Sequence, residues 1–189
     1  MYVSTPEDTV ETLLDNINKN GFNLAEEAIV NEESIRAFNP TSLNTIRIVT
    51  VRSGDYFKII CACLRIGAKG SSVDNVSSGG TSARINLETH KLDSVFFANA
   101  YREIPTSQSG RNDIGFEIPY WKETVKLVEE ASKKIPQIHI VGWDVAITPK
   151  GPALIEGNES FHTDVMQVYA SATEPGIKDV FCEALTHIE

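Results

Sequence analysis

Two neighbouring stretches of the chain alternate between apolar and polar residues and are rich in β-branched side chains. The first, NTIRIVTV, runs from residue 44 to 51, and the second runs from Tyr56 to Ile66 after a turn at Ser53-Gly54-Asp55. Such alternation, interrupted by a short polar turn, predicts a β-hairpin. Residues 81–87 and 92–98 predict two further short strands.

The amino-terminal part predicts a helix, a strand and a helical link. Apolar residues at positions 10, 13, 14 and 17 have helical spacing and follow Thr5-Pro6. This pattern predicts an N-cap at Thr5, proline at the first helical position and an end at Asn20-Gly21. Residues 22–30 then predict a short strand, and the acidic segment before the Asn39-Pro40 breaker predicts a helical link.

In the second half of the chain the period becomes helical. Residues 121–135 carry apolar side chains on one face and Lys and Glu on the other, which predicts an amphipathic helix that ends before Pro136. A last helix is predicted near residues 177–188. Because there is no internal repeat and no linker-like segment, these elements predict an α+β fold in which helices pack on an antiparallel sheet.

Two polar segments between these elements predict loops. Residues 67–80, GAKGSSVDNVSSGG, are too polar for a regular element and too compact for a linker between domains. We therefore interpret them as a functional loop. Residues 105–111, rich in Ser, Thr and Gly, predict a second loop.

Composition narrows the classes of function. With 189 residues, 41% hydrophobic and 23% charged, the chain can bury a core and is neither disordered nor fibrous. Its 17 basic and 26 acidic side chains give a formal net charge of -9, which disfavours nucleic acid as a partner. A nucleoside triphosphate would need a divalent cation and individually placed arginines.

The cysteines and the hydropathy pattern predict a cytoplasmic location. Cys61, Cys63 and Cys182 have no CxxC spacing and are too few for a disulfide framework, so a reducing compartment is expected. On a strand Cys61 and Cys63 share one face, and we expect both to be buried small hydrophobes. The acidic amino terminus leads into no apolar segment and no run of 18 apolar residues occurs, so neither export nor a membrane span is expected.

The segment IHIVGWDVAITPKGPALIEGN predicts a hairpin that brings three oxygen-bearing side chains together. Its two apolar strands flank the turn at Pro149-Lys150-Gly151. If Lys150 is the centre of the turn, Asp144 lies directly opposite Glu156, with Cβ atoms about 4.5–5.5 Å apart. Asn158 lies two residues beyond Glu156 and therefore points to the same side.

These three side chains indicate a magnesium site. Two carboxylates and a carboxamide are hard oxygen ligands, which suit Mg2+ better than zinc or copper and leave positions for phosphates and water. The alternative is an exposed hairpin whose acidic residues are only solvated. Apolar neighbours on both strands favour the metal site, because facing carboxylates within a buried sheet need compensation.

The same hairpin resembles the magnesium-binding hairpin of ATP-grasp ligases, which carries Asp on one strand and Glu-x-Asn on the next. Other segments follow the order found in the sugar-transfer-associated ATP-grasp family: PTSLNTIRIVTV, LRIG followed by VDN and GG, GFEIPYW, and GWDVAIT with GPALIEGN. The resemblance covers residues from about 24 to 170. It implies the tail of the lid and the hinge strand over residues 1–30, and the carboxy-terminal metal- and nucleotide-binding subdomain over residues 31–189.

The resemblance also implies roles for individual residues. Arg47 and Arg65 would approach the triphosphate or the acyl-phosphate, and the alternative is ordinary surface ion pairing. Four residues of the hinge strand would border adenine through their backbone, and the alternative is an acidic edge strand: Glu26, Glu27, Ala28 and Ile29. Four others would form a substrate-side loop, and the alternative is a plain flexible loop: Asp74, Asn75, Gly79 and Gly80.

The chain departs from the ATP-grasp pattern in three places. Many of these enzymes have an arginine two residues before the first metal-binding acid, where this chain has Gly142, so Arg47 or Arg65 would supply that charge. Many relatives continue with a proline and glycine turn after the Glu-x-Asn motif, where this chain has Glu159-Ser160-Phe161-His162. The amino-terminal lobe and most of the lid, which carry phosphate-binding lysines, are expected to be missing.

The function that the resemblance implies is that of an ATP- and Mg2+-dependent ligase. Such an enzyme activates a carboxylate as an acyl-phosphate, which an amine or similar nucleophile attacks, here with a sugar-linked acceptor in cell-surface polysaccharide modification. One alternative is a truncated, non-catalytic module that binds nucleotide or assembles with a separate amino-terminal lobe or a second copy. Another is a metal-dependent phosphohydrolase. No Ser/His/Asp or Cys/His grouping indicates covalent catalysis.

Overall fold

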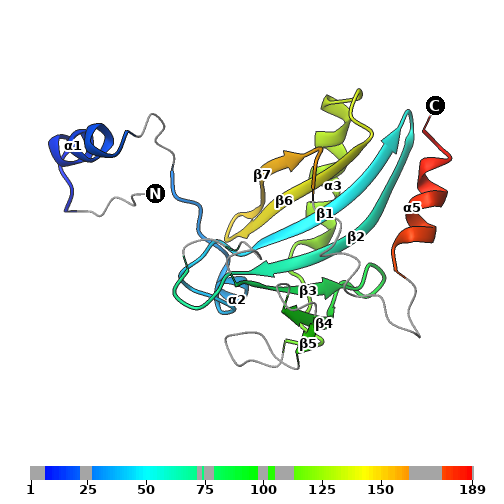
Figure 1. Ribbon diagram of the computed structural model, residues 1–189, viewed down its shortest axis with the longest axis horizontal. Coiled ribbons are helices and arrows are strands. Elements are labelled where there is room, and N and C mark those ends of the chain that lie inside the picture. Colours follow the sequence, from blue (N-terminus) through cyan, green and yellow to red (C-terminus); the bar gives the residue numbers. More distant parts are fainter. Residues whose placement is uncertain are drawn as a thin grey trace.

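A single antiparallel sheet forms the centre of the molecule (Figure 1). The computed structural model describes residues 7–21, 27–71, 74, 79–97, 102–104, 113–161 and 176–188, without the side chains of 95–97 and 102–104. Seven strands pair in the order β5-β4-β3-β2-β1-β6-β7. Their bounds are β1 Thr45–Ser53, β2 Tyr56–Ile66, β3 Thr81–Ile85, β4 Leu92–Phe97, β5 Arg102–Ile104, β6 Ile140–Thr148 and β7 Gly151–Asn158.

The predicted hairpins are confirmed. β1 and β2 pair from Thr45–Arg65 to Ser53–Tyr56, and the two-residue turn begins with Gly54 at a φ of 55°, a backbone conformation that glycine adopts without strain. β3 and β4 end one or two residues earlier than predicted, at Ile85 and Phe97. β5 was not predicted, because three residues show too little alternation to indicate a strand.

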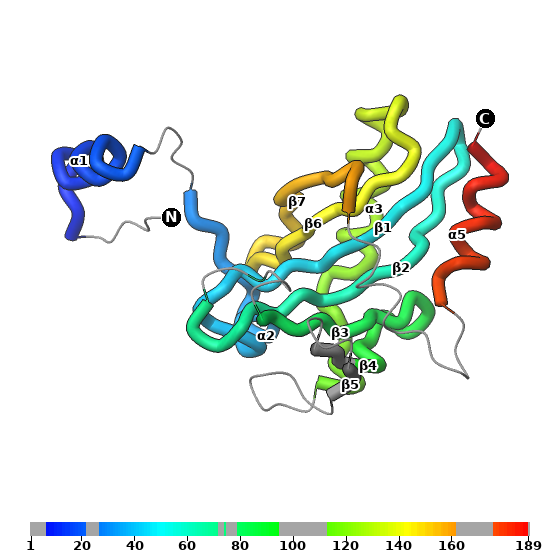
Figure 2. The backbone as a smooth tube through the Cα atoms, in the orientation of Figure 1, coloured from blue at the N-terminus to red at the C-terminus, as the bar shows by residue number. Residues whose placement is uncertain are grey.

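Two helices cover opposite faces of the sheet. The helix α3 (Trp121–Lys134) packs on one face through Trp121 and Val128, over a large apolar core that includes Trp143. The helix α5 (Lys178–Leu185) lies on the other face, over Val49, Val51 and Ile60. Both were predicted with boundaries within three residues. A single turn, α2 (Glu33–Arg36), forms the predicted helical link. In the tube of Figure 2, α5 lies beside β2.

The amino-terminal predictions need two corrections. The helix α1 (Val10–Asn20) begins four residues later than predicted, because Thr9 and not Thr5 caps it and accepts a hydrogen bond from the Thr12 amide at 3.3 Å. Its predicted end at Gly21 is confirmed. The strand over residues 22–30 is wrong for residues 27–30, which have no regular structure and no strand partner, and residues 22–26 lie outside the described residues.

α1 lies away from the sheet in Figures 1 and 2, and none of its residues is buried. The chain joins the sheet at Asn31 and Glu32. The Glu32 amide donates to the carbonyl of Ile147 at 2.8 Å, and the Asn31 side chain donates to the carbonyls of Asn44 and Ile147. This segment therefore continues the hydrogen bonding of β6 past Thr45, the first residue of β1.

The loops agree with the prediction wherever they can be seen. The described part of residues 67–80 contains no helix or strand, and residues 105–111 lie outside the described part of the chain. Among the residues that the structure describes, no helix combines the length and apolar character needed to cross a membrane.

Candidate functional site

Four charged side chains lie side by side across the strands β7, β6, β1 and β2. We call them the charged row: Glu156, Asp144, Arg47 and Arg65. Asp144 pairs with Glu156 on one side and with Arg47 on the other, and Arg65 lies one pair further along, opposite Thr45. The row therefore brings together residues that are up to 109 positions apart in the sequence.

The charged row lies on the face of the sheet opposite to α3. The residues on either side of Arg47 and Asp144 belong to the core under α3: Ile46, Ile48, Trp143 and Val145. Side chains alternate between the two faces of a strand, so Arg47 and Asp144 point the other way. β1 and β6 therefore each present one charged residue, Arg47 and Asp144, on the face of the sheet that α5 covers in part.

The predicted pairing of Asp144 with Glu156 is confirmed, although its premise was wrong. The turn has two central residues, Pro149 and Lys150, and Thr148 pairs with Gly151. With that turn, regular pairing would place Asp144 opposite Ile155. A β-bulge between Asp144 and Val145 absorbs one extra residue of β7, which restores the pairing of Asp144 with Glu156.

Asp144 is the acceptor at the centre of the row. Arg47 donates to it from Nε to Oδ1 at 2.5 Å and from Nη2 to Oδ2 at 2.9 Å, and Arg65 Nη1 donates to Oδ2 at 2.8 Å. The side chain of Asp144 is only 5% exposed. Burial raises the pKa of Asp144, but the hydrogen bonds and charges of Arg47 and Arg65 outweigh it and hold that pKa below its usual value.

Arg65 also contacts Asp74 from the 67–80 segment. Its Nη2 lies 3.0 Å from Asp74 Oδ1. Asp74 Oδ2 accepts from the Thr45 backbone amide at 3.0 Å and from the Thr45 hydroxyl. Burial raises the pKa of Asp74 and outweighs the opposing effect of Arg65. No local pattern predicts this contact, since Thr45 and Asp74 are 29 residues apart.

The donor set at the end of the row fits a divalent cation of the magnesium type. Asn158 Nδ2 donates to Glu156 Oε1 at 3.0 Å, and Glu156 is paired with Asp144 across the two strands. Two carboxylates and an amide oxygen are hard ligands. No third acidic, histidine or cysteine side chain joins them among the described residues, so the remaining positions would fall to water or phosphate.

A comparison with known families identifies the family of this chain. A family model for sugar-transfer-associated ATP-grasp proteins matches residues 8–180. The chain belongs to this family. No curated protein and no solved structure matches the chain. Proteins with the ATP-grasp fold bind ATP, so membership supports nucleotide binding, whereas the roles of individual residues remain predictions.

The structure explains why this ATP-grasp protein has glycine at position 142. Gly142 lies on the same face as Asp144, and a Cβ atom there would lie 2.9 Å from Cγ of Phe161. The Phe161 ring therefore occupies the space of any side chain at position 142. The positive charge beside Asp144 comes from Arg47 and Arg65, which both contact it.

Other predicted site residues of this ATP-grasp chain lie outside the charged row. Glu27, Ala28 and Ile29 are exposed, and Glu26 and Asn75 lie outside the described residues. Gly80 is buried, and Gly79 has a φ of 89°, which favours glycine. The predicted contacts of these residues with adenine or substrate stay predictions.

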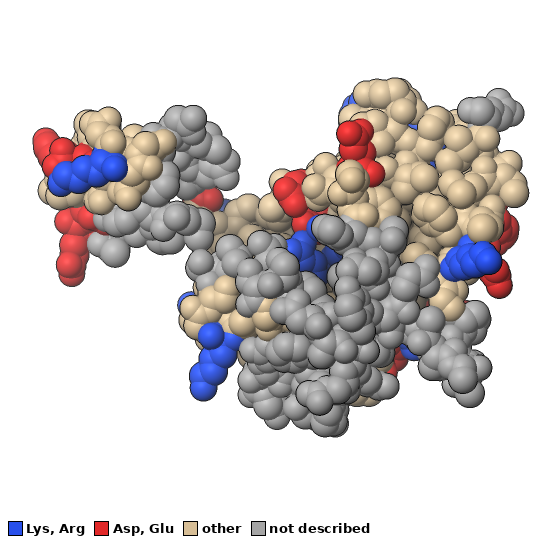
Figure 3. Space-filling model, in the orientation of Figure 1, with Lys and Arg blue, Asp and Glu red and all other residues tan. Residues whose placement is uncertain are grey.

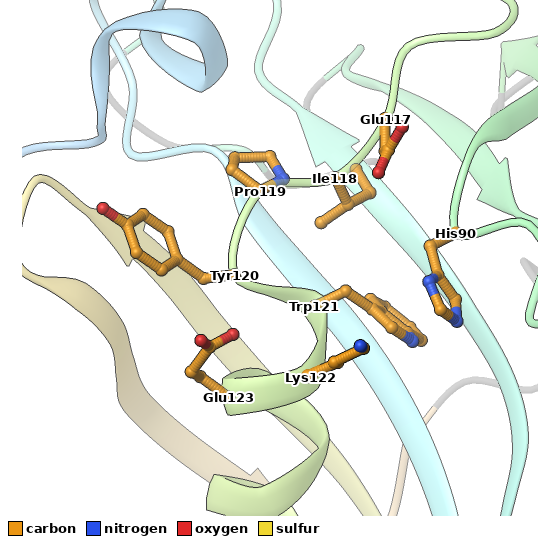
Figure 4. Close-up of a pocket in the computed structure, with 8 residues that line it drawn as sticks. All are labelled: His90, Glu117, Ile118, Pro119, Tyr120, Trp121, Lys122 and Glu123. Carbon is orange, nitrogen blue, oxygen red and sulfur yellow. The ribbon is translucent and has the colours of Figure 1, made fainter.

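A shallow pocket of about 360 Å³ lies at the start of α3, lined by His90 and residues 117–123 (Figure 4). These residues include most of the GFEIPYW segment. His90 stacks on Trp121 with ring centroids 5.5 Å apart, and Tyr120 points away from both rings. Trp121 belongs to the core under α3, so this pocket lies on the other face of the sheet from the charged row.

Proposed function

We propose that this chain is the cation- and nucleotide-binding part of an ATP-dependent ligase that activates a carboxylate. The observation that supports the proposal is the charged row, in which two acidic residues and an amide lie next to two guanidinium groups on one face of the sheet. Family membership supports ATP as the nucleotide. Figure 3 shows, among the described residues, a small group of basic atoms beside acidic atoms near the centre of the face.

In this proposal Asp144, Glu156 and Asn158 would hold Mg2+, which neutralises charge on the phosphate oxygens. Arg47 and Arg65 would bind the transferred phosphoryl group, because a guanidinium donates to two oxygens at once. Their partial burial strengthens this attraction, since exposed charges are screened. The side chain of Arg47 is 16% exposed and that of Arg65 is 12% exposed.

The proposed reaction has two steps. An oxygen of the carboxylate substrate attacks the γ-phosphorus of ATP, which forms an acyl-phosphate and releases ADP. An amine or similar nucleophile then attacks the acyl carbon and phosphate leaves. Residues 26–29 would border adenine, and the loop with Asp74, Asn75, Gly79 and Gly80 would face the substrate. The acceptor would be a sugar-linked precursor of a cell-surface polysaccharide, and the protein would act in the cytoplasm.

The second candidate is a non-catalytic module that binds nucleotide or assembles with a separate amino-terminal lobe. One observation favours it. Both arginines of the charged row already contact carboxylates. A triphosphate would therefore meet few unpaired cations on this face unless a metal ion or another lobe supplied positive charge.

Calorimetric titration with Mg-ATP tests the proposed site. Glu156→Gln should weaken binding at least tenfold. Glu183→Gln should not, because it alters only a surface ion pair between Glu183 on α5 and Lys58 on β2. Equal affinities of wild type and Glu156→Gln would show that the cation site is wrong. ATP turnover measured with and without carboxylate and amine substrates then separates the candidates, because a ligase needs both and the module shows none. Turnover without either would indicate a phosphohydrolase.

A further inference from the structure

The two arginines of the charged row are anchored differently. Within the described residues, the side chain of Arg47 donates its hydrogen bonds to Asp144. Arg65 divides its hydrogen bonds between Asp144, at 2.8 Å, and Asp74, at 3.0 Å. Asp74 is itself fixed by the amide and hydroxyl of Thr45. If both arginines lost Asp144, Arg65 would keep a carboxylate partner and Arg47 would lose the one shown here.

The carboxylate of Asp144 cannot keep its hydrogen bonds to Arg47 and also coordinate a divalent cation without weakening one of the two interactions. Its two oxygens already accept three hydrogen bonds from the arginines. A magnesium ligand must direct a lone pair at the ion from about 2.0–2.1 Å. The ion would then repel a guanidinium bonded to the same carboxylate, and the burial of this side chain leaves that repulsion poorly screened.

The balance of charge decides whether Arg47 can bind a phosphate while it stays on Asp144. Without a cation, the two guanidinium groups face three carboxylates, those of Asp144, Asp74 and Glu156. This group has no positive charge left over for a triphosphate. A phosphate would have to compete with Asp144 for Arg47, which is a bidentate and largely desolvated pair.

The geometry points to Arg47 as a cation-controlled phosphate-binding residue. Arg47 stays on Asp144 in the free protein and leaves it when Asp144 takes a divalent cation, which makes its guanidinium available to a phosphate oxygen beside the ion. Arg65 remains on Asp74 throughout. This inference rests on the proposed cation site and adds an order to it: the cation must be present before the phosphate can engage Arg47.

The first test measures Mn2+ binding by electron paramagnetic resonance without nucleotide. Arg47→Met should bind Mn2+ about tenfold more tightly than wild type, because the competitor for Asp144 is gone. Arg47→Lys keeps the charge but not the two-pronged contact, and should bind about threefold more tightly. Arg84→Lys is the matched control and should leave the affinity unchanged. Arg84 lies on β3, two strands from Arg47, and contacts Asp93 on β4. Wild-type affinity in Arg47→Lys would overturn the inference, since simple charge repulsion predicts that result.

The second test follows the arginine Nε–Hε signals by nuclear magnetic resonance during a Mg2+ titration. The Arg47 signal should shift and exchange faster with solvent, whereas the Arg65 signal should keep its protection. An Arg47 signal that stays unchanged while Mg2+ binds would overturn the inference and leave the proposed function intact. If Mg2+ binding is the same in Glu156→Gln as in wild type, the proposed cation site itself fails. The two failures are therefore distinguishable.

Discussion

Glu156 lies opposite Asp144 because Ile155 is accommodated as an extra residue in β7. Near the two-residue turn, the register of β6 and β7 pairs Thr148 with Gly151 and Val145 with Leu154. The bulge shifts this register by one residue, so that Asp144 pairs with Glu156. Since a shift of one residue moves every following side chain to the other face, the bulge decides whether Glu156 and Asn158 share a face with Asp144.

Because of the bulge, deleting one residue of β7 and inserting one should have opposite effects on Mn2+ binding. Deleting Ile155 should leave a regular ladder in which Glu156 still faces Asp144, so Mn2+ affinity should stay within about threefold of wild type. Inserting one alanine after Ile155 should turn Glu156 and Asn158 to the other face and weaken Mn2+ binding more than tenfold. Paramagnetic resonance measures both. Loss of binding in the deletion variant with retained binding in the insertion variant would contradict this register.

Gly142→Ala should destabilise the protein by about 1–3 kcal/mol, because its Cβ atom would overlap the Phe161 ring at 2.9 Å. Urea unfolding at neutral pH measures the change. Phe161→Ala removes the obstacle, so the second substitution should cost much less in the Gly142→Ala background than in wild type. Additive costs would show that the two residues do not compete for space.

Removing Asp74 should cost more than removing Asp93, although each carboxylate pairs with one arginine. Asp74→Ala leaves a nearly buried Arg65 with one partner fewer and removes both hydrogen bonds to Thr45, so we expect a loss of about 2–4 kcal/mol in the free energy of unfolding. Asp93→Ala breaks a contact whose side chains are 27% and 29% exposed, and should cost below about 1 kcal/mol. Chemical unfolding of both variants is the comparison, and equal losses would contradict it.

The stability contributed by Asp144 should disappear in acid. Its pKa is lowered in the folded protein, so the group stabilises the fold above its unfolded pKa, about 3.9, and loses that effect as pH falls through the folded value. Asp144→Asn should therefore be much less stable than wild type at pH 7, and the difference should shrink steadily below pH of about 4. Urea unfolding at several pH values tests this. A difference that is constant with pH would show that the charge of Asp144 does not stabilise the fold.

The sequence predicted those parts of the fold that depend on near neighbours. The β1–β2 hairpin was predicted because alternation and a short turn carry the whole signal, and Asp144 and Glu156 are joined by a single hairpin. The pairing of β1 with β6 depends on contacts between residues such as Arg47 and Asp144, 97 positions apart, and no local pattern encodes it. The start of α1 was misplaced because Thr5 and Thr9 are both good caps, and the choice between them is made by the backbone.

The charged row joins an interior strand to the rim of the sheet. Asp144 and Arg47 belong to strands paired on both sides, whereas Glu156 and Asn158 come from β7, the last strand in the order of the described sheet. One half of the row is therefore fixed by neighbouring backbone, and the other half can fray. A ligand that bridges Asp144 and Glu156 would hold the edge strand β7 against the interior strand β6. Binding of that ligand and the ordering of β7 would therefore favour each other.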